Sequence, residues 1–234
     1  MSKPDDRSHA WRPRTRAIRA GLNRTGFRET SEAIFMNSGY VYDSAQEAEE
    51  SFDGTRERMV YSRFKNPTVA MFEDRLAAVE GAEACRATAS GMAAVHAALV
   101  SQLKAGDRVV AARALFGSCQ WIIDDLLPRF GVERTFVDGA DLADWERALS
   151  RPATCVFLET PCNPTLELID IAAVAALAHR AGARLVVDNV FATPLLQSPL
   201  ALGADVVVYS ATKHIDGQGR CLGGAVLADR AFCD

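Results

Sequence analysis

The side chain that could do the most chemistry in this sequence is the amine of Lys213. It follows an apolar run, Val206–Tyr209, that is typical of a buried strand, and it precedes a loop with glycines at positions 217, 219, 223 and 224. Open α/β sheets bind ligands just beyond the carboxyl ends of their strands. A lysine at such an end, partly desolvated and near other cationic groups, can attack a carbonyl carbon. An arbitrary lysine at a strand end is more often an ordinary surface residue.

A turn suited to an anion lies upstream, at Ser90-Gly91-Met92. It opens an alanine-rich helix that we expect to run to Leu103. The first turn of a helix has free backbone N–H groups and the positive end of the helix dipole, so this turn suits a phosphate. Serine is also a common helix cap that binds nothing, so the turn alone is a weak signal.

Two further polar side chains follow predicted strands. Asp188 comes directly after the apolar run Leu185–Val187, and it needs a partner because burying an unpaired carboxylate is costly. Asn163 lies in the proline-rich loop after the run Cys155–Leu158. Asn163 could be a turn residue with a local hydrogen bond, or a donor to a ligand.

These residues must be positioned by alternating strands and helices. A helix is predicted from Asn66-Pro67 to Gly81, with Val69, Phe72, Leu76 and Val79 on one face. Further helices are expected around 117–128, 141–149 and 171–181, with a strand at 109–112. Phe116, just before the helix expected around 117–128, would by default be a core aromatic. The alternation predicts an α/β fold, with a mostly parallel sheet and helices on both of its faces.

In such a fold the polar residues meet at one crevice. A lysine that traps an aldehyde, a carboxylate for a ring nitrogen and a helix end for a phosphate together describe the binding of pyridoxal 5′-phosphate (PLP). Two other interpretations are weaker. Ser210-x-x-Lys213 matches the nucleophile motif of penicillin-recognising enzymes, but their S-D-N and K-T-G elements are absent. A dinucleotide site would need its glycines after the first strand.

Composition limits the other classes of function. With 234 residues and 49% hydrophobic content the chain can bury a core as one large domain. A net charge of −4 speaks against nucleic-acid or membrane-surface partners, and neither a membrane-length apolar run nor a secretory signal is found. Six scattered cysteines and four histidines suggest no disulfide framework and no metal site, as expected of a cytoplasmic protein.

The first 60 residues differ from the rest. Residues 1–28 carry eight Lys and Arg, whereas 29–57 carry eight Asp and Glu. A transit peptide, a nucleic-acid arm and a tail that docks on another subunit are the candidate interpretations. From the residues alone we expect residues 1–60 to form an extended, poorly packed N-terminal arm, followed by the ligand-binding domain at 61–234.

Five separated motifs resemble one known family, the Cys/Met-metabolism group of fold-type I PLP enzymes. This group includes cystathionine γ-synthases, cystathionine γ-lyases and homoserine sulfhydrylases. The motifs are Tyr61-Ser62-Arg63 with Asn66-Pro67-Thr68, Ser90-Gly91-Met92, Glu159 to Pro164, Val187-Asp188-Asn189 and Ser210 to Lys213. Within the group, the segments 24–34, 115–118, 188–191 and 215–221 are most similar to the enzymes that use O-succinylhomoserine. The resemblance covers about residue 15 to the end.

The resemblance implies a role for each matching residue. Lys213 would bond the cofactor aldehyde and move the Cα and Cβ protons, and Asp188 would hold the proton on the ring nitrogen. Phe116 would stack on the ring, and Asn163 would donate to its phenolic oxygen. The phosphate would be bound by Gly91, Met92, Ser210 and Thr212, and by Tyr61 and Arg63 from a neighbouring subunit, so a homodimer or homotetramer is implied. The arm at 1–60 would then be a subunit-docking segment.

The implied reaction is a γ-replacement. O-Succinyl-L-homoserine and sulfide would give L-homocysteine and succinate, a step of methionine biosynthesis. The alternatives are cystathionine γ-synthase or γ-lyase activity, or a PLP-binding fragment without turnover. Family members continue beyond the position of Asp234 with a small domain that binds the substrate carboxylate, and the resemblance implies that this domain is missing here.

Overall fold

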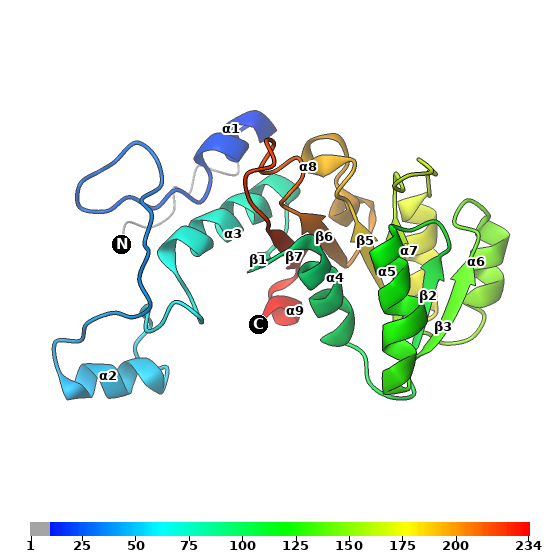
Figure 1. Cartoon of the computed structure of the whole chain (residues 1–234), viewed down its shortest axis with the longest axis horizontal. Coiled ribbons are helices and arrows are strands. Elements are labelled where there is room, and N and C mark those ends of the chain that lie inside the picture. Colours follow the sequence, from blue (N-terminus) through cyan, green and yellow to red (C-terminus); the bar gives the residue numbers. More distant parts are fainter. Residues whose placement is uncertain (1–9) are drawn as a thin grey trace. The chain divides into compact units, whose positions relative to one another are not determined.

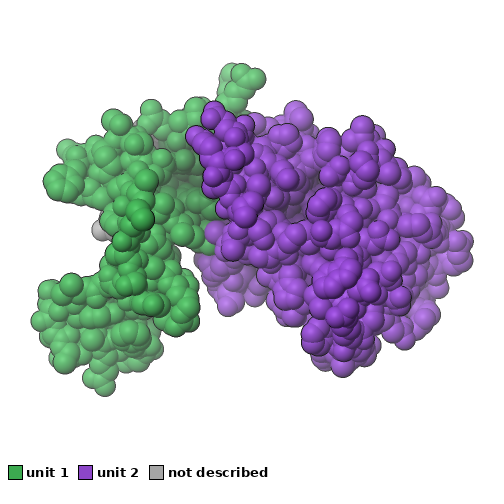
Figure 2. Space-filling view, viewed as in Figure 1, with its two compact units in different colours: residues 1–78 green, residues 79–234 purple. Residues whose placement is uncertain are grey.

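The computed structural model describes residues 10–234 (Figure 1). The chain forms two compact units, which we call unit 1 (1–78) and unit 2 (79–234) and which Figure 2 shows in green and purple. The first nine residues of the predicted arm lie outside the described residues. The division expected from the sequence at residues 60/61 stays a prediction, because compactness and family domain limits are different criteria.

Unit 1 is mostly extended chain with short helices. It contains α1 (Pro13–Arg19), α2 (Ala45–Phe52) and most of α3 (Pro67–Glu80). Ser44 caps α2 by accepting from the amide of Glu47, whose buried carboxylate pairs with Arg58 at 2.8 Å. Gly21 has a φ of +70° and packs so closely on α3 that a Cβ would lie 2.7 Å from the carbonyl oxygen of Met71, so only glycine fits there.

Helix α3 confirms the helix predicted from Pro67, and Gly81 ends it with a φ of +86°. The face expected to be apolar is only partly buried. Leu76 is buried, whereas Val69 is 43% exposed, and Ala70, Met71 and Ala77 supply most of the buried surface instead.

Unit 2 is built on a seven-stranded sheet whose strand order is β1-β7-β6-β5-β4-β2-β3. Only β7 runs antiparallel to its neighbours, β1 and β6, which confirms the mostly parallel sheet. The strands are β1 (Ala84–Thr88), β2 (Arg108–Ala112), β3 (Glu133–Val137), β4 (Cys155–Glu159), β5 (Arg184–Asp188), β6 (Val206–Ser210) and β7 (Gly224–Ala228).

Helices cover both faces of this sheet. The connections through α4 (Gly91–Val100) and α5 (Gly117–Trp121) run along the sheet in one direction, and those through α6 (Leu142–Ala148) and α7 (Ile171–Arg180) run in the other. Since such crossovers are right-handed, the two pairs lie on opposite faces. In Figure 1, α4 and α5 lie on the near side of the strands and the yellow α7 lies behind them.

The remaining helical segments are short. A π-helical turn (Ile122–Leu126) and a 3₁₀ turn (Leu127–Phe130) continue α5 to Gly131, which has a φ of +77°. Helix α8 (Thr193–Leu196) and a second 3₁₀ turn (Pro199–Leu202) connect β5 to β6, and α9 (Arg230–Cys233) follows β7. Among residues 10–234, no helix has the length and apolar character that crossing a membrane requires.

Candidate functional site

A cavity of about 790 Å³ lies in unit 2, at the carboxyl ends of the parallel strands. The connections reverse direction between β2 and β4, the position at which open α/β sheets bind ligands. Eight of the ten predicted site residues line this cavity: Gly91, Met92, Phe116, Asn163, Asp188, Ser210, Thr212 and Lys213. The fold therefore brings these eight residues together, although they span more than a hundred positions of the sequence.

Lys213 lies in the tight turn that follows β6. Its amide donates to the carbonyl of Ser210 at 3.3 Å, and its carbonyl accepts from the amide of Gly217 at 2.8 Å. The side chain is exposed and forms no hydrogen bond or ion pair with any residue in 10–234. The described residues thus leave the amine free at the cavity. They do not bury it, so the partial loss of solvent that we expected to activate this amine is not found among them.

Asp188 ends β5, and its carboxyl group is almost without partners. It is 6% exposed; Oδ1 accepts from the amide of Val190 at 3.1 Å, and Oδ2 lies 4.0 Å from the Cys119 sulfur. Burial, together with the nearby charge of Glu159, raises the pKa of Asp188 to about 7. A cationic donor in the cavity would therefore find a carboxylate with unused acceptor capacity.

Glu159 ends β4 beside Asp188, and the sequence interpretation did not assign it to the site. Its carboxylate accepts from the backbone amide of Phe116 at 2.5 Å and from that of Asn163 at 3.1 Å. One buried group thus ties together two loops that face the cavity, and burial raises its pKa. Glu159 could have been found from the sequence, because it is an acidic residue directly after an apolar run, the same pattern that indicated Asp188.

Phe116 and Asn163 both reach the cavity from these loops. Phe116 is 42% exposed, so the default interpretation as a core aromatic is wrong. Its ring is free for a flat ligand to stack on it. Asn163 is exposed, and only its backbone is held: its amide donates to Glu159 and its carbonyl accepts from the Cys162 thiol, which leaves its side chain free to donate.

The helix end predicted to bind an anion is formed as expected. The Ser90 hydroxyl accepts from the amide of Ala93 at 3.1 Å, which leaves the first amides of α4, at Gly91 and Met92, without intrahelical acceptors. A Cβ at Gly91 would lie 2.5 Å from the Cβ of Ser210. Gly91 therefore lets the helix end and the Ser210 hydroxyl meet at one place.

Thr212 is engaged elsewhere in this structure. Its hydroxyl accepts from the amide of Gly223 at 3.1 Å and lies 3.3 Å from the Gly223 carbonyl oxygen. This pair closes the glycine-rich loop after Lys213. Thr212 lines the cavity, but its hydroxyl would have to exchange a partner to bind an anion.

The residues of the cavity fit PLP. Asp188 offers a buried acceptor for a protonated ring nitrogen, and the end of α4 with Ser210 offers donors for a phosphate. Lys213 supplies the free amine, and Phe116 an exposed ring. The site thus joins an acceptor for a cation and a cradle for an anion, which matches the charges of the cofactor.

Tyr61 and Arg63 belong to unit 1. The Arg63 guanidinium lies 5.6 Å from the ring centre of Tyr61 and 4.4 Å from that of Phe64. It forms no ion pair with the described residues, and Tyr61 is 42% exposed. Both residues are available to a partner, and their role in a neighbouring site stays a prediction.

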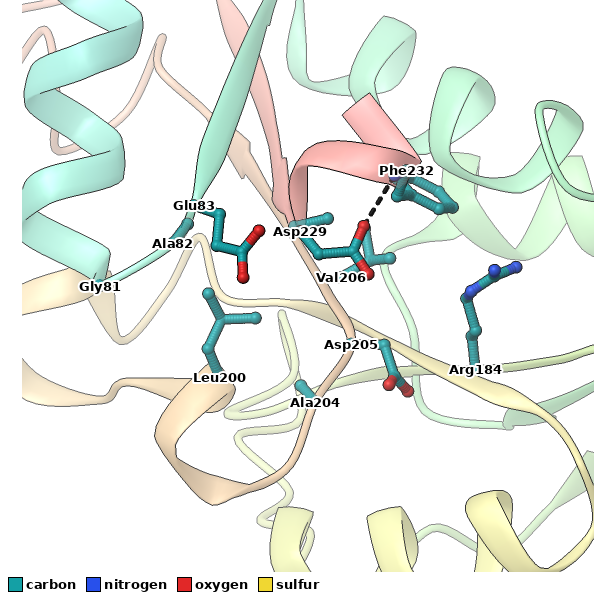
Figure 3. Close-up of a pocket in the computed structure, with 11 residues that line it drawn as sticks. Gly81, Ala82, Glu83, Arg184, Leu200, Ala204, Asp205, Val206, Asp229 and Phe232 are labelled. Atoms are coloured by element: carbon teal, nitrogen blue, oxygen red, sulfur yellow. Dashed lines mark hydrogen bonds between the residues drawn. The ribbon is translucent and has the colours of Figure 1, made fainter. Parts of the chain in front are cut away.

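A second, smaller pocket of about 250 Å³ lies in unit 2 at the amino ends of β5 and β6 (Figure 3). Its carboxylates are already partnered. Asp205 accepts from the amide of Leu185 at 2.7 Å and lies 2.9 Å from His179 Nε2, and Asp229 accepts from the amide of Phe232 at 2.7 Å. Glu83 accepts from the amide of Arg230 at 3.2 Å. Glu83 and Asp229 are exposed to solvent, so this pocket offers no buried acceptor comparable to Asp188.

Comparison with known proteins also indicates PLP as the cofactor. Residues 14–233 match the model of the Cys/Met metabolism PLP-dependent enzyme family. The chain is 60% identical to an O-succinylhomoserine sulfhydrylase of Mycobacterium tuberculosis (99% of this chain, 56% of the relative). It is 50% identical to one of Pseudomonas aeruginosa (91% of this chain, 53% of the relative). The chain thus spans little more than half the length of these relatives.

Among solved structures, a putative O-acetylhomoserine (thiol)-lyase of Campylobacter jejuni superposes with a TM-score of 0.89 at 32% identity. The match covers 95% of this chain and 55% of that one. That protein carries a pyridoxyl-lysine phosphate group, a covalent adduct of the kind that the sequence predicts at Lys213.

Proposed function

Because the chain belongs to the Cys/Met metabolism family of PLP-dependent enzymes, we propose that it takes part in a γ-replacement on O-succinyl-L-homoserine. Sulfide would replace succinate at Cγ and give L-homocysteine. The observation that carries the proposal is the single cavity in which Lys213, Asp188, Phe116, Asn163 and the amino end of α4 meet. The 60% identity to a sulfhydrylase supports the choice of substrate.

The cofactor, when bound, supplies an aldehyde that bonds an amine and a ring that accepts electrons from the substrate. The residues of the chain do the rest. Asp188 keeps the proton on the ring nitrogen, which sustains the ring's capacity to accept electrons. Phe116 packs on the ring and excludes water from that face, and Asn163 donates to the ring oxygen. The amides of Gly91 and Met92 and the Ser210 hydroxyl would hold the phosphate, and Thr212 would join them once its hydroxyl exchanges its Gly223 partner.

Lys213 moves the protons of the reaction. Its Nζ would take the proton from the substrate Cα, release that proton again within the site, and then, as a neutral amine, take one from Cβ, which would allow succinate to leave from Cγ. After sulfide has added at Cγ, the same amine returns protons to Cβ and Cα. The net change exchanges a succinate oxygen for a sulfide sulfur, without any oxidation or reduction.

A second copy of the chain completes the site in this proposal. Unit 1 exposes large apolar side chains that a partner could cover, among them Phe27, Ile34, Met36, Val41 and Phe64, each at least 63% exposed. The unpaired Arg63 would hold the phosphate of the neighbour, with Tyr61 beside it. The smallest complete unit is then a homodimer.

The location that we propose is the cytoplasm. All six cysteines are free thiols in the described residues, including the exposed Cys221. Free thiols persist where the surroundings are reducing. The fraction in which the native protein is recovered, cytoplasmic or membrane-associated, tests this directly.

The test of the activity begins with the colour of the protein. With PLP the chain should gain a visible absorbance band that borohydride fixes to a peptide containing Lys213, and Lys213→Ala should lose it. With O-succinyl-L-homoserine and sulfide it should then release homocysteine and succinate. A coloured protein that releases neither product would reject the γ-replacement and favour a cofactor-binding fragment.

The shared site can be tested by mixing two inactive variants. Lys213→Ala and Arg63→Ala subunits, exchanged to equilibrium, should form mixed dimers with one site that has both residues. About one quarter of all sites would then be intact, and activity should return. If mixing restores nothing while the subunits do exchange, Arg63 does not serve the neighbour.

A further inference from the structure

A chain of buried side chains runs beneath the cavity, and one of its members, Tyr209, is among the residues that line the cavity. Tyr209 of β6 donates from its hydroxyl to Glu80 at 2.5 Å, and it accepts from the Asn189 side-chain amide at 2.5 Å. Tyr209 is 2% exposed, Glu80 4% and Asn189 0%. None of the three belongs to the predicted set of site residues.

Gln197 extends the chain toward β4. The Gln197 side-chain amide donates to Asn189 Oδ1 and to the backbone carbonyl of Thr160, both at 2.8 Å. The backbone carbonyl of Gln197 accepts from Asn189 Nδ2 at 3.0 Å. The direction of the donors is consistent along the whole path. The Tyr209 hydroxyl has one proton, which goes to Glu80, and so it can only accept from Asn189.

Three residues of this network are next to a segment that faces the cavity. Tyr209 directly precedes Ser210, Asn189 directly follows Asp188, and Thr160 opens the loop that carries Asn163. The network therefore spans the ends of β4, β5 and β6, which pair in that order in the sheet. Fixing these three ends relative to one another fixes the three cofactor contacts that they carry.

We propose that Glu80, Tyr209, Asn189 and Gln197 are positioning residues, which hold Asn163, Asp188 and Ser210 at the distances that PLP requires. The inference rests on the proposed cofactor site, since it assigns no chemistry of its own. Sites work when the groups that touch the ligand are held by hydrogen-bonded neighbours, and a loose support weakens binding by displacing those groups.

Glu80 is the anchor because it comes from outside the sheet, at the end of α3. Burial raises the pKa of Glu80 to about 7, although the hydrogen bond from Tyr209 acts in the opposite direction. Burying a carboxyl group costs free energy, so Glu80 is a poor choice of residue if its role were only to end the helix. Its contact with Tyr209 instead ties that helix end to the strand that leads to Ser210 and Lys213.

Four variants of the full chain test the proposal. Tyr209→Phe removes the hydroxyl and keeps the ring, and Glu80→Leu removes the acceptor. Glu80→Gln is the conservative control, because its amide oxygen can still accept from Tyr209. Trp145→Phe is the matched control: it removes another fully buried hydrogen bond, from Trp145 Nε1 to the Gly139 carbonyl at 3.0 Å, away from the cavity.

Two measurements are made on each variant. Hydrogen exchange of peptides covering 187–198 and 208–213 needs no cofactor, with the peptide of β2 as internal reference. Titration of the visible absorbance gives the Kd for PLP. We expect Tyr209→Phe and Glu80→Leu to speed exchange in both peptides and to raise the Kd for PLP about tenfold. Glu80→Gln and Trp145→Phe should leave both quantities within about twofold of the parent chain.

The failures of the two proposals are distinguishable. A parent chain that takes up no PLP contradicts the proposed function, and the exchange data alone then decide on the network. If the parent binds PLP and Tyr209→Phe binds it equally well, the positioning role is overturned, even where exchange is faster. Tyr209→Phe alone decides if Glu80→Leu does not fold.

Discussion

The two ends of the central strands in unit 2 both carry carboxylates, but the neighbours of these groups differ. At the edge where the parallel strands begin, Asp205, Asp229 (which follows the antiparallel β7) and Glu83 (which precedes β1) each accept from a backbone amide close by. At the carboxyl ends, Asp188 and Glu159 lie side by side, both almost fully buried, and Asp188 accepts from one amide only. Asp229 and Glu83 are exposed, so water can complete their hydrogen bonds, and Asp205 has a second partner in His179, whereas Asp188 is buried with one amide partner. Buried acceptors with unused capacity therefore mark the end of the sheet that carries the cavity better than the number of charges does.

The largest expected effect comes from comparing two lysines at opposite ends of the sheet, Lys213 and Lys104. Lys213→Ala should abolish the visible absorbance with PLP and reduce turnover to background, because the amine that bonds the aldehyde is gone. Lys104 is exposed in the loop before β2, at the amino ends, and Lys104→Ala should change neither quantity. Loss of the colour in Lys104→Ala would break the comparison.

The next largest effect is expected from comparing Asp188, at the cavity, with Asp205, at the other end of the strands. Asp188→Asn should lower kcat by about 10²- to 10³-fold, because the ring nitrogen loses its charged partner. Asp205→Asn should leave kcat within about twofold. Steady-state kinetics on both variants check this, and equal losses would show that the two ends do not differ as described.

Glu159→Gln should weaken cofactor binding by about tenfold. The amide group that replaces one carboxylate oxygen would face a backbone N–H, of Phe116 or of Asn163, and one of the two loops would be released. Titration of the visible absorbance gives the Kd for PLP. Glu83→Gln, at the amino ends, is the control and should bind PLP like the parent.

Without the cofactor, the free energy of unfolding should fall as the pH rises from 5 to 8. Asp188 and Glu80 have pKa values of about 7 in the folded chain, above the ordinary carboxyl value. The folded state therefore binds more protons than the unfolded state between about pH 4 and 7, and the stability is lost across this range, by up to about 1.4 kcal/mol per pH unit for each group. Urea unfolding at several pH values checks this, and Asp188→Asn should flatten the slope.

The smallest effect is expected from the amino-end cap. Asp229→Ala removes the hydrogen bond to Phe232 at the start of α9 and should cost about 1 kcal/mol of unfolding free energy. Because Asp229 lies at the end of the sheet away from the cavity, the Kd for PLP should stay unchanged. A shift in that Kd would show that the ends are coupled.

Most of the strands were predictable because their sequences are short apolar runs. The runs at 109–112, 155–158, 185–187 and 206–209 all lie inside strands with little or no exposed surface. Strand β3 has no such signal: Glu133, Arg134 and Thr135 lie at the edge of the sheet and only Val137 is buried. Edge strands keep polar side chains, so their sequences look like loops.

The site was predictable where polar residues follow those runs. Asp188 stands out because it ends an apolar strand, and Lys213 because it lies in the turn that follows one. The support beneath them was not predictable, because Glu80 and Tyr209 are 129 positions apart and each alone looks unremarkable. A buried tyrosine and a glutamate at a helix end become meaningful only when the fold brings them into contact.

The position of β7 has a consequence for synthesis of the protein. Strand β7 lies between β1 and β6 and pairs with both, so Cys85 meets Leu227 across most of unit 2. On the ribosome, β1 emerges early and has no neighbour until residues 224–228 have also emerged. A chain truncated after residue 222 and released from the ribosome should therefore leave the amides of β1 open to exchange with solvent, although the other five strands are already complete.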